Sequence, residues 1–276
     1  MDRLISVSSA PIAAVGDREF YDLVGTIDVL KRILSTSVVD GFELQLEPEW
    51  DNQHPPLTDQ DFADWTQTPK YTAQEVASLL KREELPILSV HASRDIGNYL
   101  CSIEECDWNK GSQDIWDALY IAEELGAHIC VFHLWDTWAK TFDLTHVQNA
   151  FREVTRAFPR VKASCENIPT QLQNCTPFSL ARLFDYVTLD IRWAAFYNEL
   201  DAFEEIMDKV VNVHMRGKLG DGKWILDRSS YGFYDALRKL LHDWKYQGLL
   251  TVEPEGALDS SRFDDFISAM KTFNDV

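Results

Sequence analysis

The sequence predicts an α/β protein with the (β/α)8 architecture of a TIM barrel, in a single domain over residues 1–276. Three observations support this. Strand-like apolar runs and amphipathic helix-like segments alternate eight times without a break in composition. The chain length is close to the roughly 250 residues typical of such a barrel. Several of the apolar runs also end in a carboxylate or a histidine, and a barrel gathers the carboxyl ends of all its strands on one face.

The first half of the chain predicts four strand–helix units. Strands are expected over residues 4–8, 41–47, 87–92 and 129–134. Helices are expected to follow them over residues 20–34, 76–80, 115–125 and 147–158, where apolar residues recur three and four positions apart. Gly126 and Pro159 follow the last two helices as stop signals.

The second half repeats the scheme. Strands are expected to end at Glu166, Asp190, His214 and Glu253, followed by helices over residues 180–184, 200–210, 233–244 and 263–273. Helix-to-strand turns are short, whereas the strand-to-helix loops over 48–72, 94–112, 169–177 and 216–230 are long. Long loops at the carboxyl face of a barrel predict a substrate pocket there. An open doubly wound sheet is the alternative, but it would not bring ligands from six strands together.

Composition and charge restrict the possible partners and location. The chain is 45% hydrophobic and 12% aromatic, which is ample for a core. Its net charge of −19 repels polyanions, so nucleic acid is not expected as a partner. No long apolar span and no secretory signal are seen, and no membrane association is expected. Five cysteines, an odd number, suggest reduced thiols in a cytoplasmic protein. The oligomeric state is left open.

Four strand ends carry the residues of a mixed oxygen and nitrogen metal site. Because side chains alternate along a strand, the residue two before each strand end shares its face. These ends are Glu166, Asp190, His214 and Glu253, a set that suits Mn²⁺, Zn²⁺, Co²⁺ or Mg²⁺. One such residue alone is more often a hydrogen-bonded side chain than a ligand. Four ligand-type residues at the same end of their strands and on the same face favour a divalent metal ion.

Two histidines extend this set. His91 and His133 end strands three and four. They could hold a second metal ion bridged by Glu166, or they could contact substrate oxygens. We therefore expect one or two metal ions per chain.

The strand ends from five to eight resemble a known group, the xylose isomerase-like barrels of sugar phosphate isomerases, epimerases and endonuclease IV. In epimerase-type members a Glu-Asn pair, an Asp, a His and a Glu close these strands and hold one divalent metal. Glu166-Asn167, Asp190, His214 and Glu253 are similar in order and spacing. The resemblance implies a sugar or sugar phosphate substrate that is isomerised or epimerised. It also implies Glu166 and Glu253 as the catalytic acid/base pair, acting through a metal-bound enediolate.

The endonuclease IV branch is similar in other positions. Its histidines at the ends of strands three and four correspond to His91 and His133. Its Asp-Arg-His motif corresponds to Asp227-Arg228-Ser229, and Trp193 stands where that branch has a further histidine. Two ligands of a third metal are therefore replaced, so a trinuclear site is not expected. A metal-dependent phosphoesterase and a non-catalytic metabolite-binding barrel are the alternative functions.

Further residues near the strand ends are candidates for binding substrate. Arg216 lies two residues beyond His214 and could hold a substrate oxygen or a phosphate, although pairing with an acidic residue is an equal alternative. Glu47 ends strand two, and Trp193 could stack on a sugar ring. Asp227, in the loop expected after strand seven, is a further candidate for binding substrate. Glu43, on the same strand as Glu47, is expected deep in the barrel in a hydrogen-bond network.

Overall fold

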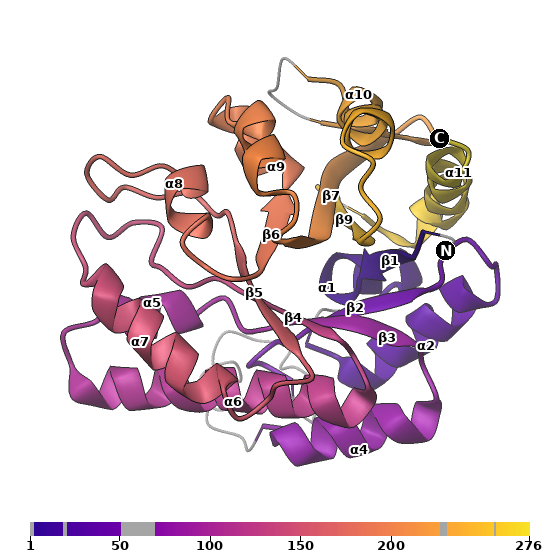
Figure 1. Ribbon diagram of the computed structural model, residues 1–276. Helices are drawn as coiled ribbons and strands as arrows, with labels where there is room; N and C mark the ends of the chain where they lie inside the picture. The colour runs from indigo at the N-terminus through magenta and orange to yellow at the C-terminus, as the bar shows by residue number, and fades with distance from the viewer. Residues whose placement is uncertain (1–2, 19–20, 51–69, 227–230, 257) are drawn as a thin grey trace, which may run out of the picture.

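Eight parallel strands close into a barrel, and helices surround it (Figure 1). The computed structural model describes residues 3–18, 21–50, 70–226, 231–256 and 258–276. Each strand pairs with the next along the chain, and β9 closes the barrel by pairing with both β1 and β7. The (β/α)8 prediction is therefore confirmed. The barrel strands are β1 (Ile5–Ser8), β2 (Gly41–Gln45), β3 (Ile87–His91), β4 (Ile129–Phe132), β5 (Lys162–Glu166), β6 (Val187–Asp190), β7 (Val210–Gly220) and β9 (Leu249–Glu255).

The helices lie outside the barrel and bury one face against it. Their starts carry side-chain caps: Thr72 forms a capping box before α4, and the carboxylate of Asp143 caps α7. Gly126 ends α6 with a φ of 73°, which a residue with a Cβ rarely adopts. Within the described ranges, no helix is long and apolar enough to cross a membrane. The helices are α1 (Ser9–Ile12), α2 (Leu23–Leu34), α4 (Ala73–Glu83), α5 (Ile96–Cys101), α6 (Glu105–Leu125), α7 (Leu144–Thr155), α8 (Pro177–Ala181), α9 (Ile191–Phe196), α10 (Phe233–Arg238) and α11 (Phe263–Asn274).

The barrel interior is polar in the layer beneath the strand ends. The hydroxyls of Ser164 and Thr188 lie 2.7 Å apart, and Thr251 Oγ1 donates to Asn212 Oδ1 at 2.9 Å. Residues of the opposite phase, such as Cys165 and Leu189, belong to the apolar core that packs on the helices. The predicted phase of these strands is thus confirmed. Residues two apart on a strand share a face. Glu166 and Asp190, two residues beyond Ser164 and Thr188, therefore also point into the barrel, at its carboxyl end.

Three expectations were wrong in detail. The segment 216–230 was expected to be a loop, but β7 runs on to Gly220 and forms an antiparallel hairpin with β8 (Lys223–Ile225). Asp221 and Gly222 both have positive φ, which matches the right-handed twist of a two-residue hairpin. The segment 94–112 contains α5 and the start of α6. The helix expected over residues 200–210 is a 3-10 helix, Leu200–Ile206, after α9.

Candidate metal centre and substrate pocket

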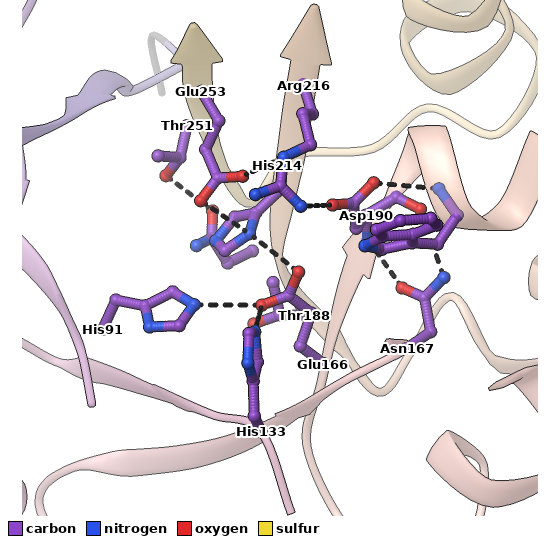
Figure 2. Close-up of polar contacts among 12 residues, drawn as sticks. His91, His133, Glu166, Asn167, Thr188, Asp190, His214, Arg216, Thr251 and Glu253 are labelled. Atoms are coloured by element: carbon purple, nitrogen blue, oxygen red, sulfur yellow. Dashed lines mark hydrogen bonds and ion pairs between the residues drawn. The ribbon is translucent and has the colours of Figure 1, made fainter. Parts of the chain in front are cut away.

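Glu166 lies at the centre of a buried cluster at the carboxyl ends of the strands (Figure 2). His91 Nε2, at the end of β3, lies 3.1 Å from Glu166 Oε2. His133 Nε2, one residue beyond β4, lies 3.0 Å from the same oxygen. The side chain of Glu166 is only 1% exposed. Three strands therefore converge on one carboxylate, as the sequence predicts for a bridging ligand.

His214 joins this cluster to Glu253. Its Nδ1 lies 3.4 Å from Glu166 Oε1 and 3.5 Å from Glu253 Oε1. On its other side, Nε2 lies 3.2 Å from the carboxylate of Glu43, which is fully buried. Ser89 and Asn212 also donate to Glu43, at 2.8 and 3.0 Å. The network predicted around Glu43 is present, and it fixes the orientation of the His214 ring.

Asp190 shares its two carboxylate oxygens between a helix and an arginine. Oδ1 accepts from the backbone N–H groups of Arg192 and Trp193, and so caps the start of α9. Oδ2 accepts from Arg216 Nη1 at 3.1 Å. The side chain of Asn167, the residue after Glu166, also holds Asp190. Its Oδ1 accepts from Asp190 N at 2.6 Å, and its Nδ2 donates to Asp190 O. Asp190 therefore keeps a fixed position beside the cluster.

Arg216 is held by carboxylates on three sides. Besides Asp190, its Nε lies 3.2 Å from Glu253 Oε2 and 3.3 Å from Glu255 Oε1. The ion-pairing role that the sequence offered for Arg216 is thus observed, although its side chain stays 27% exposed toward solvent. Burial opposes its charge, but these carboxylates outweigh burial and raise the pKa of Arg216.

The ionisation of the cluster follows from burial and from these contacts. Burial opposes a charge on Glu166, yet the neighbouring His214 and His133 hold its pKa well below the usual range. Burial also opposes a charge on His91, but the hydrogen bond to Glu166 raises its pKa to about 9. Burial dominates for His133 and lowers its pKa. Burial raises the pKa of Asp190 to about 7 against the effect of Arg216.

The donor set fits a divalent metal ion. Three groups bring their ligand atoms within 4.8 Å of one another: His91, His133 and Glu166; Glu166, Asp190 and His214; and His91, His214 and Glu253. Among the described residues, His214 Nδ1 and Glu253 Oε2 are buried and make no hydrogen bond, although each lies within 3.5 Å of an oppositely charged group. Buried polar atoms without a hydrogen bond are costly, and a metal ion would provide a stronger partner. Imidazole with carboxylate is the ligand chemistry of Zn²⁺, Mn²⁺ or Co²⁺.

A cavity of about 590 Å³ opens beside this cluster. His133 and Arg216 line it on the side of the candidate ligands. Trp193, predicted to contact substrate, lines it too, and the Arg216 guanidinium lies 6.0 Å from the Trp193 ring centre. A molecule bound here would contact the edge of the cluster at His133 and Arg216.

The remaining two predicted residues are Glu47 and Asp227. Glu47 lines a separate cavity of about 310 Å³, where burial raises its pKa to about 7 against the opposing charge of Arg94. Asp227 lies outside the described residues. Sequence reasoning missed Glu255, which pairs with Arg216, and the aromatic Phe196 and Tyr197 in the pocket. The phase of Glu255, two residues beyond Glu253, is the signal that could have found it.

Comparison with known proteins identifies the family. Residues 35–272 match the xylose isomerase-like TIM barrel family. Among solved structures, a D-allulose 3-epimerase from Methylomonas sp. in complex with D-allulose superposes with a TM-score of 0.64 at 14% identity, covering 99% of this chain and 96% of that one. A D-tagatose 3-epimerase-like protein gives a TM-score of 0.61 at 18% identity, covering 99% and 98%.

Endonuclease IV from Thermus thermophilus is similar as well. Its TM-score is 0.51 at 16% identity, covering 99% of this chain and 100% of that one. A comparison with curated protein sequences found no match. At these identities the likeness to solved structures establishes the shared barrel fold.

Proposed function

Because the chain belongs to the xylose isomerase-like TIM barrel family, we propose that it is a divalent-metal-dependent isomerase or epimerase of a sugar or sugar phosphate. One observation carries this proposal. Glu166 and Glu253 come from β5 and β9, yet both lie within 3.5 Å of His214 Nδ1. Glu166 contacts His133 and Glu253 contacts Arg216, and these two partners line a substrate-sized cavity. Of two carboxylates placed around the same point, one can remove a proton from the substrate and the other can return a proton to it. The D-allulose bound to the related Methylomonas epimerase is a sugar of this kind.

Glu166, Asp190, His214 and Glu253 would hold the metal ion. When bound, a divalent ion polarises a carbonyl group and stabilises the negative charge that develops on its oxygen. His214 and His133 hold the pKa of Glu166 well below the usual range against the effect of burial, so this carboxylate is ionised, as a metal ligand must be. Arg216 fixes the carboxylates of Asp190 and Glu253 relative to each other through its two ion pairs.

Solvent isotope exchange tests the proposal. The protein, loaded with Mn²⁺ or Co²⁺, is incubated in D₂O with a panel of ketoses and ketose phosphates, and deuterium uptake is followed by NMR. We expect uptake at the carbon beside the carbonyl, and its loss in Glu253→Gln. Glu123→Gln on α6, whose partner is the exposed Arg160, is the matched control and should exchange as the wild type does. No uptake from any sugar by the metal-loaded protein would overturn the assignment.

A second candidate is a metal-dependent phosphoesterase. Its supporting observation is the convergence of His91 and His133 on one oxygen of Glu166. A metal ion held by such a group would activate water for attack on phosphorus. Incubation with DNA that contains an abasic site distinguishes the two functions. Strand cleavage without deuterium uptake from any sugar would favour the phosphoesterase.

A further inference from the structure

The cavity beside the cluster has an aromatic wall that the proposed proton transfer does not use. Trp138, Trp193, Phe196 and Tyr197 all line it. Trp138 is 77% exposed and Phe196 is 59% exposed. Large apolar side chains gathered at a pocket mark a ligand-binding surface, since exposing them to water is unfavourable. The wall therefore needs an occupant with an apolar face.

One part of this wall is tied to the cluster through a helix. Trp193 and Phe196 lie on α9, the short helix that Asp190 caps, with ring centres 6.3 Å apart in an edge-to-face arrangement. Phe196 in turn contacts Tyr197 at 5.4 Å. Trp138 comes from the loop after β4, where its backbone N–H donates to Asp136 Oδ1 at 2.7 Å. The aromatic side chains of α9 are thus connected to the candidate ligand Asp190.

The charges around the cavity disfavour a phosphate group. Among the described residues that line it, Arg216 is the one with a permanent positive charge. Three carboxylates, those of Asp190, Glu253 and Glu255, already lie within 3.3 Å of its guanidinium. A phosphate approaching Arg216 would meet the same three negative charges, in a protein whose net charge is −19. The structure offers a neutral ligand a better fit.

We propose that the substrate is a neutral sugar with a flat substituent on a hydroxyl away from its reacting carbonyl, and that this substituent stacks on Trp138 and Phe196. This substrate class rests on the proposed function of the site. A second sugar ring and an aromatic group share the required chemistry, a flat face of C–H or π character. The cavity of about 590 Å³ is in the range of about 300–1,000 Å³ that accommodates ligands of this size.

Binding measurements test the proposal independently of turnover. Titration calorimetry and tryptophan fluorescence, with Co²⁺-loaded and metal-free protein, compare four probes in the gluco and galacto series: the monosaccharide, a reducing disaccharide linked through O4, the 4-O-phenyl ether and the 6-phosphate. We expect the disaccharide or the phenyl ether to bind about tenfold more tightly than the monosaccharide. Which of the two binds more tightly identifies the substituent. The 6-phosphate should gain nothing over the monosaccharide.

Variants connect this preference to the aromatic wall. Trp138→Ala and Phe196→Ala should each remove most of the tenfold gain, whereas Trp138→Phe should keep part of it. Trp116→Ala is the matched control, because Trp116 is 42% exposed on α6 and stacks on Tyr120 outside the cavity.

Three results would overturn the proposal: equal affinity for all four probes, no binding of any, or tightest binding of the phosphate. Deuterium uptake from simple sugars together with any of these results would leave the proposed function standing without this substrate class. Tight binding of the substituted sugars without uptake from any sugar would instead reject the proposed function.

Discussion

Removing the charge of Glu43 should weaken metal binding although Glu43 is not itself a predicted ligand. Its carboxylate is fully buried below the cluster and accepts from Ser89, Asn212 and His214. Burial opposes its charge, but the charge of His214 and these hydrogen bonds lower its pKa, so it is ionised at neutral pH. Burial opposes a charge on His214, but Glu43, Glu253 and Glu166 raise its pKa well above the usual range, so the metal-free ring is protonated. A carboxylate can only accept, so Nε2 keeps its proton beside Glu43, and a metal ion would displace the proton of Nδ1.

The size of the effect follows from these contacts. Glu43→Gln keeps the shape but removes the charge that holds the proton on Nε2 of His214. Loss of such a carboxylate partner typically costs about 10- to 100-fold in metal affinity. The substituted side chain has an N–H₂ group in place of one carboxylate oxygen, and this group cannot accept a hydrogen bond. One buried donor would lose its acceptor, which costs about 1–3 kcal/mol of folding stability. Glu43→Ala leaves three buried donors unpaired and should lose about 3 kcal/mol or more.

Calorimetric titration with Co²⁺ and Zn²⁺, beside urea unfolding of the metal-free protein, measures both effects. Ser89→Ala is the matched control, because it removes one hydrogen bond to Glu43 and keeps the charge. It should change metal affinity by less than Glu43→Gln does. Unchanged metal affinity in a folded Glu43→Gln protein would refute the role assigned to this carboxylate.

Three further predictions concern the metal site. Asp190→Ala and His214→Ala should each give a folded barrel that has lost its metal, and unchanged metal content by elemental analysis would contradict the ligand assignment. Wild-type protein should bind one or two ions per chain, and anomalous scattering from a third ion near Asp227 would oppose this. Metal affinity should fall as the pH is lowered through about 9, where His91 takes up its proton, and fall further through about 7, where Asp190 does, since ligands bind metal in their deprotonated form. Calorimetry across this pH range that shows no loss would exclude Asp190 as a ligand.

The barrel and the position of the cluster were predictable because both depend on local periodicity. Side chains two apart on a strand share a face, so Ser164 below Glu166 and Thr188 below Asp190 indicated which way each ligand points. Parallel connectivity then places the strand ends on one face. The structure bears out both steps, with six predicted metal-site residues gathered at the carboxyl ends of the strands.

The extension of β7 was harder to predict, although a signal was present. The pair Asp221-Gly222 is typical of a two-residue hairpin turn, and Trp224 on the returning strand is 2% exposed, packed on Phe233 and Phe266. Basic residues beyond His214 made this stretch look like a loop. The alternation of Arg216 and Lys218 with the buried Gly217 and Leu219 fits a strand exposed on one side better.

The ion pairs of Arg216 could not be deduced from sequence because they depend on register between strands. In the barrel Arg216 is paired across the sheet with Glu253, while Asp190 is paired with His214. Strand stagger in a closed barrel is set by the tilt of all the strands together, which no single segment encodes. Arg216 therefore stands at the level of Glu253, two residues beyond the partner of Asp190, and its guanidinium reaches both carboxylates. Because these carboxylates already engage Arg216, we expect a neutral sugar and not a phosphorylated one as the substrate.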